Sequence, residues 1–217
     1  MKVRPKTQER KLPKSSLIKP IIQFYSVKNR AAMFCESELE VDALKLLEFS
    51  PNVTRFATQP KSFEWKYEGR KFRYTPDILV KFNNEKYTFV EVKPREKARE
   101  LKFLQKFSAL RKDFLKGQNT PLRLILCTTI QSNDEHIRRH HLYRYLKRAP
   151  QTQYLCDIGK SIMTSVKTVS IGELIGAYAD EGYPDYEAWT FLAREFSRID
   201  FFGKAALTTS TNFKWSH

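Results

Sequence analysis

The sequence predicts an α/β domain with a mixed central sheet, followed by a small and mainly helical module. Three observations predict this fold class. A segment with helical spacing precedes two pairs of alternating segments, a continuous apolar run over residues 122–126 follows a second helical segment, and the pattern changes after Pro150. Alternating pairs are typical of antiparallel strands, whereas a continuous apolar run suits a strand buried on both faces. Helices interleaved with both kinds of strand indicate a mixed sheet.

The first helix is expected to begin after Ser37. Apolar residues recur at i, i+4, i+7 and i+8 from Leu39 to Leu47, and Ser50-Pro51-Asn52 ends the pattern. A strand over residues 53–56 is expected to follow.

Two hairpins come next. Aromatic residues alternate with polar ones on both sides of Glu68-Gly69, which supplies a tight turn, so residues 63–74 are expected to form one hairpin. Asp77–Phe82 and Tyr87–Lys93 form the second pair, and the turn-forming residues Asn-Asn-Glu lie between them.

The remaining elements of the core are helical apart from one strand. Apolar residues at helical spacing predict a helix over residues 96–116, which Gly117 ends. The run LRLILCT over residues 122–128 predicts the buried strand, and a basic helix over residues 134–148 follows it.

The last part of the chain has a different organisation. Ser170 is expected to cap a helix over residues 171–179, and Pro184-Asp185 to open a second helix through Ile199. The rest, residues 201–215, is β-prone. Two helices and a hairpin suit a winged-helix module, and they suit a docking platform for a partner equally well.

These patterns predict three parts, with boundaries at 1–32, 33–149 and 150–217. Residues 1–32 carry nine Lys or Arg against one acid, Glu9, and three prolines interrupt any helix. They are expected to form an extended basic arm, which is either a strap along a phosphate backbone or a solvated tail.

The charge points to a polyanionic partner. Lysine and arginine outnumber aspartate and glutamate by 39 to 24, which gives a net charge of +15. Nucleic acid is the first candidate. A membrane is not expected, because the apolar runs are far shorter than a spanning helix and no signal-peptide pattern follows the first lysine. Three scattered cysteines predict neither disulfides nor a zinc ribbon, which favours a cytoplasmic protein.

The second hairpin places two acids together. If its loop is the three residues 83–85, counting outward from the loop along both strands places Asp77 opposite Glu91. Like charges in that arrangement destabilise a sheet unless a cation compensates them. Lys93 points to the same face as Glu91 because strand side chains alternate.

Two carboxylates with a lysine beside them suit phosphodiester hydrolysis. A divalent ion such as Mg²⁺ prefers oxygen ligands, neutralises phosphate charge and lowers the pKa of a bound water. Asp77, Glu91 and the backbone carbonyl of Val92 are the expected ligands, and Mn²⁺ would substitute for Mg²⁺. Lys93 would orient the attacking water or stabilise the developing charge. The alternative is an exposed hairpin with ordinary surface charges.

An acid from the first helix is a candidate third ligand. Glu36 and Glu40 share one helix face at i, i+4. Ser37 and Glu40 also satisfy a capping box, and that alternative stays open. We favour a catalytic role for Glu40, since an acid in the first turn can both cap the helix and reach a metal ion.

The pattern Pro76-Asp77 followed by Glu91-Val92-Lys93 resembles the PD-(D/E)xK nuclease superfamily. The longer span, SELEVDALKLLEFSPNVTRFATQP, then YTPDILV and TFVEVKP, resembles the TnsA endonucleases of heteromeric Tn7-like transposons, CRISPR-associated ones included. The resemblance implies a restriction-endonuclease-like core in which Glu40, Asp77 and Glu91 bind the metal ion and Lys93 is the catalytic lysine. The family often has Gln where this chain has Glu91.

The resemblance also implies a function and partners. TnsA endonucleases cut the 5′ strand ends of a transposon in double-stranded DNA, while a TnsB-like DDE transposase cuts the 3′ ends. A TnsC-like AAA+ ATPase often contacts the C-terminal part of TnsA. Such a protein is expected in the bacterial cytoplasm. Two alternatives remain, namely a free-standing repair or junction-resolving nuclease and a DNA-binding assembly factor without catalysis.

The basic helix over residues 134–148 is expected to face DNA phosphates. The residues concerned are Arg138, Arg139, Arg144, Lys147 and Arg148.

Overall fold

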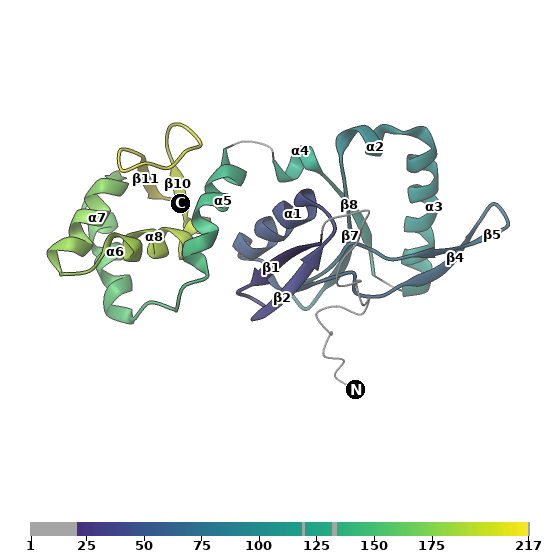
Figure 1. Ribbon diagram of the computed structural model, residues 1–217, viewed down its shortest axis with the longest axis horizontal. Coiled ribbons are helices and arrows are strands. Elements are labelled where there is room, and N and C mark those ends of the chain that lie inside the picture. The colour runs from purple at the N-terminus through teal and green to yellow at the C-terminus, as the bar shows by residue number, and fades with distance from the viewer. Residues whose placement is uncertain (1–20, 119, 132–133, 217) are drawn as a thin grey trace. The chain divides into compact units, whose positions relative to one another are not determined.

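The computed structural model describes residues 21–118, 120–131 and 134–216. The chain divides into two compact units, one ending at Ser132 and the other beginning at Asn133. Figure 1 labels their helices and strands. Each unit is described by itself.

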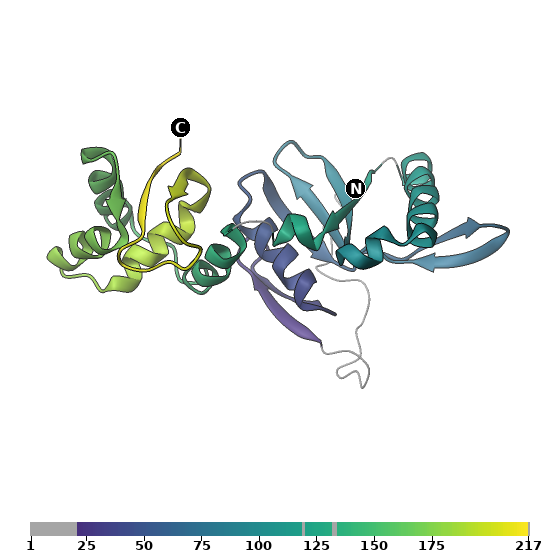
Figure 2. The ribbon, with the colours of Figure 1, turned by 90° about the horizontal axis from the view of Figure 1, so that it is seen from above.

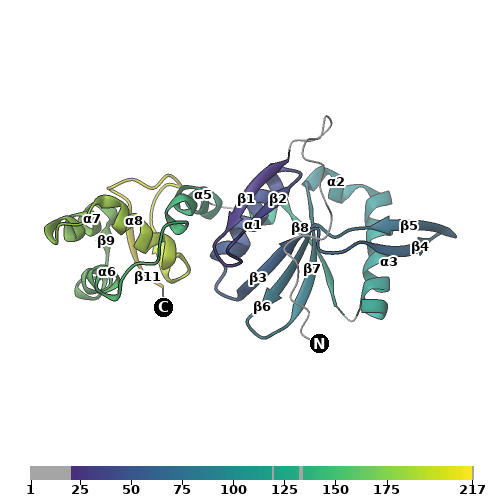
Figure 3. The ribbon, with the colours of Figure 1, turned by 60° about the horizontal axis from the view of Figure 1, so that its bottom comes forward.

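A four-stranded sheet forms the centre of the first unit, in the order β3-β6-β7-β8 (Figure 3). The strands are β3 (Val53–Thr58), β6 (Ile78–Phe82), β7 (Tyr87–Lys93) and β8 (Leu122–Leu126). The first three are antiparallel neighbours, whereas β7 and β8 are parallel. The α/β class and the mixed sheet expected from the sequence are confirmed.

Helix α1 (Glu38–Phe49) packs beside β3 and β7. Its N-cap is Ser37, whose side chain accepts a hydrogen bond from the backbone N–H of Glu40. The helix ends at Ser50, as the Ser-Pro-Asn stop predicts.

The hairpin of β4 (Phe63–Tyr67) and β5 (Arg70–Tyr74) is separate from the central sheet. Glu68 and Gly69 both have positive φ angles, 49° and 75°, as a two-residue hairpin turn requires. Seen from above, the hairpin runs across α3 (Leu101–Gln118) and extends beyond it (Figure 2). Aromatic and aliphatic side chains from β4, α3, β7 and β8 form a core there: Phe63, Trp65, Phe89, Phe107, Leu110, Phe114 and Leu122.

Two helical segments differ from the prediction. The single helix expected over residues 96–116 is broken into α2 (Arg95–Arg99) and α3 at Glu100, whose ψ angle of 122° is extended. The strand expected through residue 128 ends at Leu126, and a short helix α4 (Cys127–Ile130) follows it.

The start of the described chain also differs from the expected arm. Residues 1–20 lie outside the described residues, but β1 (Ile22–Ser26) and β2 (Ala31–Cys35) pair as an antiparallel hairpin. Phe24, Met33 and Cys35 are buried. Alternating apolar side chains on both strands therefore make residues 22–35 part of the folded unit.

A buried charge network ties this hairpin to the C-terminal end of α1. Ser26 Oγ donates to Glu48 Oε2 over 2.8 Å, and the backbone N–H of Lys28 donates to Glu48 Oε1 over 2.7 Å. Burial raises the pKa of Glu48 and lowers the pKa of Lys28 to about 8. The Lys28 ammonium donates to the carbonyl oxygens of Leu47 (3.0 Å), Val53 (2.7 Å) and Ser50.

We expect Lys28→Met to destabilise the protein by about 3 kcal/mol, because three backbone carbonyls lose their donor and the buried Glu48 carboxylate loses the nearby positive charge. Urea unfolding measures the change in the free energy of unfolding. The matched control is Lys66→Met on β4, where the lysine is exposed and the change should stay within about 0.5 kcal/mol. Equal stability of the two variants would contradict a structural role of Lys28.

The second unit packs four helices around a small sheet. The helices are α5 (Glu135–Leu146), α6 (Gln153–Ser165), α7 (Ile171–Asp180) and α8 (Asp185–Arg194). The sheet has the order β10-β11-β9, with β9 (Val169–Ser170), β10 (Ile199–Phe201) and β11 (Asn212–Trp215).

Its helices follow the prediction in part. Ser170 caps α7 through a capping box with Glu173. The second expected helix ends earlier, at Arg194, and a 3₁₀ turn, Phe196–Arg198, leads into β10. The sequence reasoning did not anticipate α6. That helix lies so close to α8 that a Cβ on Gly159 would come within 2.6 Å of the Phe191 ring.

Helix α5 belongs to the second unit, whereas the predicted boundary after residue 149 placed it in the core. The Tyr145 ring stacks on Trp189 of α8, with centroids 5.7 Å apart. The Arg148 guanidinium lies 3.6 Å from the centroid of Tyr186. These aromatic contacts explain why the boundary comes before α5.

Within the described part of the chain, no helix is long and apolar enough to span a membrane.

Candidate active site

Two carboxylates lie side by side where β6 begins. The observed pairing of Ile78 with Val90 confirms the predicted register, so Asp77, just before β6, lies opposite Glu91 on β7. The backbone N–H of Val92 donates to Asp77 Oδ2 over 2.7 Å, and the backbone N–H of Gln59 donates to the Asp77 carbonyl oxygen over 2.7 Å. Asp77 is thus fixed at both its main chain and its side chain.

Glu91 is held on both carboxylate oxygens. Its side chain is buried, and Oε1 lies 2.6 Å from the Lys93 ammonium. The Tyr74 hydroxyl at the end of β5 donates to Oε2 over 2.5 Å. The carboxylate therefore has one orientation, with the lysine on one side and the phenol on the other.

The site places more acidic than basic side chains together. Burial and the nearby charge of Glu91 raise the pKa of Asp77 to about 8. Burial alone would lower the pKa of Lys93, but the surrounding carboxylates raise it above its usual value, so the lysine stays protonated. One lysine thus faces two acids in a partly desolvated place, which is the electrostatic setting that suits a divalent cation.

Glu40 has the helix-capping role that the sequence left open. Its carboxylate accepts hydrogen bonds from the backbone N–H of Glu36 over 3.0 Å and from Ser37 Oγ over 2.9 Å. Its charge still acts on the pKa values of Asp77 and Lys93. The helix therefore brings Glu40 near the two strand acids, while both its oxygens are engaged at the cap.

The predicted metal ligands meet in part. Asp77 and Glu91 come together, but in the region that the structure describes no three His, Cys, Asp or Glu side chains gather closely enough to hold a metal ion. Val92 contributes its N–H to Asp77. The roles of Glu40 and of the Val92 carbonyl as ligands stay predictions.

Two polar residues beside the acids make contacts that the sequence pattern does not show. Tyr74 packs against the aromatic core, as alternation favours, but alternation does not show that its hydroxyl reaches Glu91. Gln59 resembles a turn residue, yet it is only 6% exposed and its φ angle is 43°. Its amide donates to Glu36 Oε1 over 3.0 Å, and its Oε1 has no hydrogen-bond partner in the described region. A residue before proline usually has an extended backbone, so the Gln-Pro dipeptide gives no signal for this positive φ angle.

Two of the basic residues predicted to contact DNA are inside the second unit. Arg138 and Arg139 are 8% and 4% exposed. The Arg138 guanidinium donates to the carbonyl oxygens of Phe201 (3.4 Å), Gly203 (3.0 Å) and Lys204 (3.2 Å), and Arg139 pairs with Glu135 over 2.9 Å. Their contacts therefore do not support a DNA-binding role.

The other three basic residues of this region are exposed. Arg144, Lys147 and Arg148 each place their cation over an aromatic ring, at 4.9, 5.0 and 3.6 Å from the centroid. They keep the charge that an anionic partner would meet, and DNA contact stays a prediction for them.

Part of the chain matches a known protein family. Residues 50–126 match the family model described as TnsA-like endonuclease N terminal. The matched segment runs from just before β3 to the end of β8 and contains Asp77, Glu91 and Lys93. No curated protein matches the chain. The resemblance inferred from the sequence is confirmed for this domain.

Proposed function

We propose that this chain, whose residues 50–126 form a TnsA-like endonuclease N-terminal domain, hydrolyses the 5′ strand ends of a transposon in double-stranded DNA. A DDE transposase would cut the 3′ ends, and an AAA+ ATPase would regulate the assembly. The observation that carries the proposal is the Asp77 and Glu91 pair with its bound lysine, because it lies inside the matched domain and has the charge that metal-assisted hydrolysis needs.

The residues present fit a divalent cation. Asp77 and Glu91 are oxygen donors from adjacent strands, and when both are ionised, as a bound cation would favour, they carry a charge that Lys93 alone does not balance. They would hold Mg²⁺, or Mn²⁺ in its place, with the Val92 carbonyl and Glu40 as further candidates. When bound, the ion would neutralise phosphate charge and make hydroxide available near neutral pH.

The protein's own groups then have distinct roles. Val92 N–H orients Asp77, and the Tyr74 hydroxyl orients Glu91. Lys93 keeps its proton and can donate it in a hydrogen bond to the attacking water or to a phosphate oxygen as negative charge develops. Glu40 would take part only after exchanging its cap hydrogen bonds with Glu36 and Ser37.

The second unit supports a partner-binding or DNA-binding role. Helices α6, α7 and α8 with the β10–β11 hairpin have the order of a winged-helix module. In this proposal the exposed Arg144, Lys147 and Arg148 face an anionic partner.

The test uses end-labelled DNA that carries transposon ends, with Mg²⁺, and maps nicks on each strand. The wild type and Asp77→Ala are each assayed with and without the transposase encoded beside this chain. We expect 5′ cleavage that needs both the transposase and Asp77. Cleavage by the chain alone would favour a free-standing nuclease, and 5′ cleavage that survives Asp77→Ala would mean that the active site lies elsewhere. No cleavage by any combination, with DNA binding retained, would favour an assembly factor.

A further inference from the structure

Two cations lie directly opposite each other on the central sheet. Arg55 of β3 pairs with Lys81 of β6, and Lys81 pairs in turn with Tyr87 of β7. Like charges in directly opposed positions of an antiparallel pair destabilise a sheet. The opposition of Arg55 and Lys81 therefore does not itself stabilise the sheet, and a ligand of opposite charge would compensate it.

The row lies on the same sheet face as the active site. Strand side chains alternate with period 2, so Lys81 shares a face with Asp77, and Tyr87 shares a face with Glu91. Lys81 follows Asp77 by four residues, which corresponds to about 13 Å along a strand. The cations are thus beside the acids but beyond direct contact with a metal ion there.

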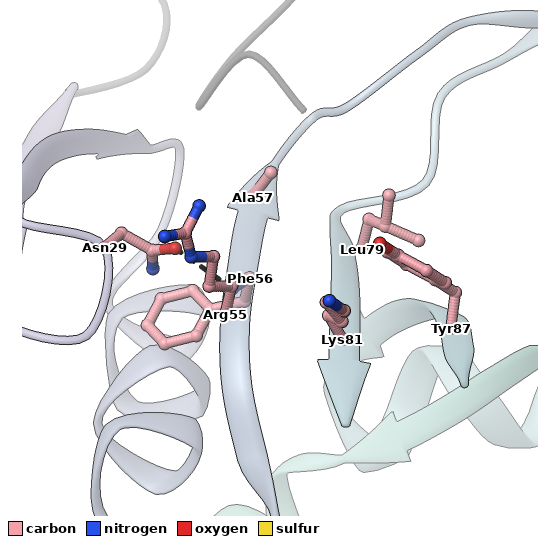
Figure 4. Close-up of a pocket in the computed structure, with 7 residues that line it drawn as sticks. All are labelled: Asn29, Arg55, Phe56, Ala57, Leu79, Lys81 and Tyr87. Carbon is pink, nitrogen blue, oxygen red and sulfur yellow. Dashed lines mark hydrogen bonds between the residues drawn. The ribbon is translucent and has the colours of Figure 1, made fainter. Parts of the chain in front are cut away.

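A small hollow connects the members of the row, and Figure 4 shows it with Lys81 standing between β3, which carries Arg55, and Tyr87. Its volume is about 50 Å³. Pockets for drug-sized ligands measure roughly 300–1,000 Å³, so this hollow suits one small anionic group. The lining residues are Asn29, Arg55, Phe56, Ala57, Leu79, Lys81 and Tyr87.

The donors of the hollow can accept such a group. Among the described residues, the Arg55 guanidinium has no hydrogen-bond or ion-pair partner, and its planar fork matches two phosphate oxygens. Lys81 pairs with Glu85 over 2.6 Å, but the Glu85 side chain is 76% exposed. Such surface pairs are weak, so a phosphate can replace this carboxylate.

We propose that Arg55, Lys81 and Tyr87 form a phosphate-binding subsite. It would bind a backbone phosphate of the cleaved DNA strand at some distance from the scissile bond. The inference rests on the proposed function, since DNA is the phosphate source to which it commits. Successive phosphates of a DNA strand rise by about 3.4 Å along the helix axis, and they are about twice as far apart through space because the strand winds. A separation of about 13 Å therefore places the bound phosphate about two nucleotides from the scissile one.

The test measures duplex binding by the full chain without divalent metal, so that it is independent of catalysis. We expect the variant Arg55→Gln/Lys81→Gln to reduce the slope of log K against log salt by about 0.9, the value for one lost phosphate contact. The matched control is Arg123→Gln. Arg123 is exposed and pairs with Val90, so it lies on the opposite sheet face and should leave the slope unchanged.

A second arm locates the phosphate. A neutral methylphosphonate is placed at single positions along the strand that carries the scissile bond. At about two nucleotides from that bond, it should weaken binding by the wild type but not by the double variant. Inorganic phosphate at millimolar concentration should not displace the duplex, whereas displacement that the double variant abolishes would assign the hollow to free phosphate instead of DNA.

Several results would overturn the proposal. They are an unchanged salt slope in the double variant, an equal effect of Arg123→Gln, and no duplex binding by the wild type at low salt. The melting temperature of the double variant shows whether it is folded, because removing two opposed cations should leave that temperature unchanged or higher. Failure of this test with 5′ cleavage intact would leave the nuclease function standing.

Discussion

Asp77→Asn is expected to abolish DNA cleavage while making the metal-free protein more stable. Asparagine has the same shape and keeps an oxygen for the Val92 N–H, so the local structure should survive. The change removes one of two charged oxygen donors for the metal ion. A loss of about 4 kcal/mol of transition-state stabilisation corresponds to about 10³-fold in rate.

The gain in stability follows from the charges around Asp77. Its carboxylate is desolvated and faces Glu91 across the strand pair. Removing a like charge from directly opposed positions should stabilise the fold by about 1 kcal/mol, which is about 2–4 °C in melting temperature.

The stability difference should also depend on pH in a defined direction. The folded-state pKa of Asp77 is raised to about 8, above the ordinary value for aspartate. Between about pH 4 and that value the unfolded chain releases its proton first, so the wild type loses stability as pH rises. Asparagine has no such proton, and the advantage of Asp77→Asn should therefore grow over this range.

Single-turnover cleavage and thermal unfolding with and without Mg²⁺ measure these effects. The matched control is Asp113→Asn, an exposed acid on α3, which should behave as the wild type in both assays. Mg²⁺ should raise the melting temperature of the wild type and of the control but not of Asp77→Asn. An active Asp77→Asn, or one that responds fully to Mg²⁺, would remove Asp77 from the metal site.

The strand register was predictable because two local rules, side-chain alternation and turn length, are enough to define it. Alternation assigns each side chain to a face, and the length of the turn then determines which positions are opposite. These two rules are enough to place Asp77 opposite Glu91, with Lys93 on the same face. Equally local rules predict the helix cap at Ser37 and the turn at Glu68-Gly69.

Contacts between distant segments were not predictable in this way. Arg138 looks like a surface cation on a basic helix, yet its partners are backbone carbonyls more than sixty residues later. The break at Glu100 was likewise not visible in the sequence, because helical spacing continues on both sides of it. A single sequence shows periodicity but not which face another segment will cover.

Glu40 shows the limit most clearly. The sequence is compatible with both a helix cap and a metal ligand, because the first turn of a helix serves either purpose. The structure has the cap hydrogen bonds and places the charge close enough to affect Asp77 and Lys93. A capping acid beside two unbalanced carboxylates is consistent with a ligand that is recruited only when a cation binds.

Lys93→Met should act in the opposite direction to Asp77→Asn on stability and in the same direction on activity. Lys93 is the cation that pairs with Glu91, at 2.6 Å, and its side chain is 27% exposed. Removing it leaves two neighbouring carboxylates without compensation. We expect a loss of about 1–2 kcal/mol in the metal-free protein, less than for a fully buried pair because solvent reaches the lysine.

The Mg²⁺ response separates the roles of the two residues. Methionine preserves the aliphatic stem but donates no hydrogen bond, so cleavage at saturating Mg²⁺ should fall by about 10²–10³-fold. The carboxylates of Lys93→Met lack their competing cation, and Mg²⁺ should therefore raise its melting temperature more than that of the wild type. Lys97→Met on α2, an exposed lysine, is the control and should match the wild type. Retained cleavage by Lys93→Met would restrict the lysine to charge compensation, and a lost Mg²⁺ response would mean that it helps to build the metal site.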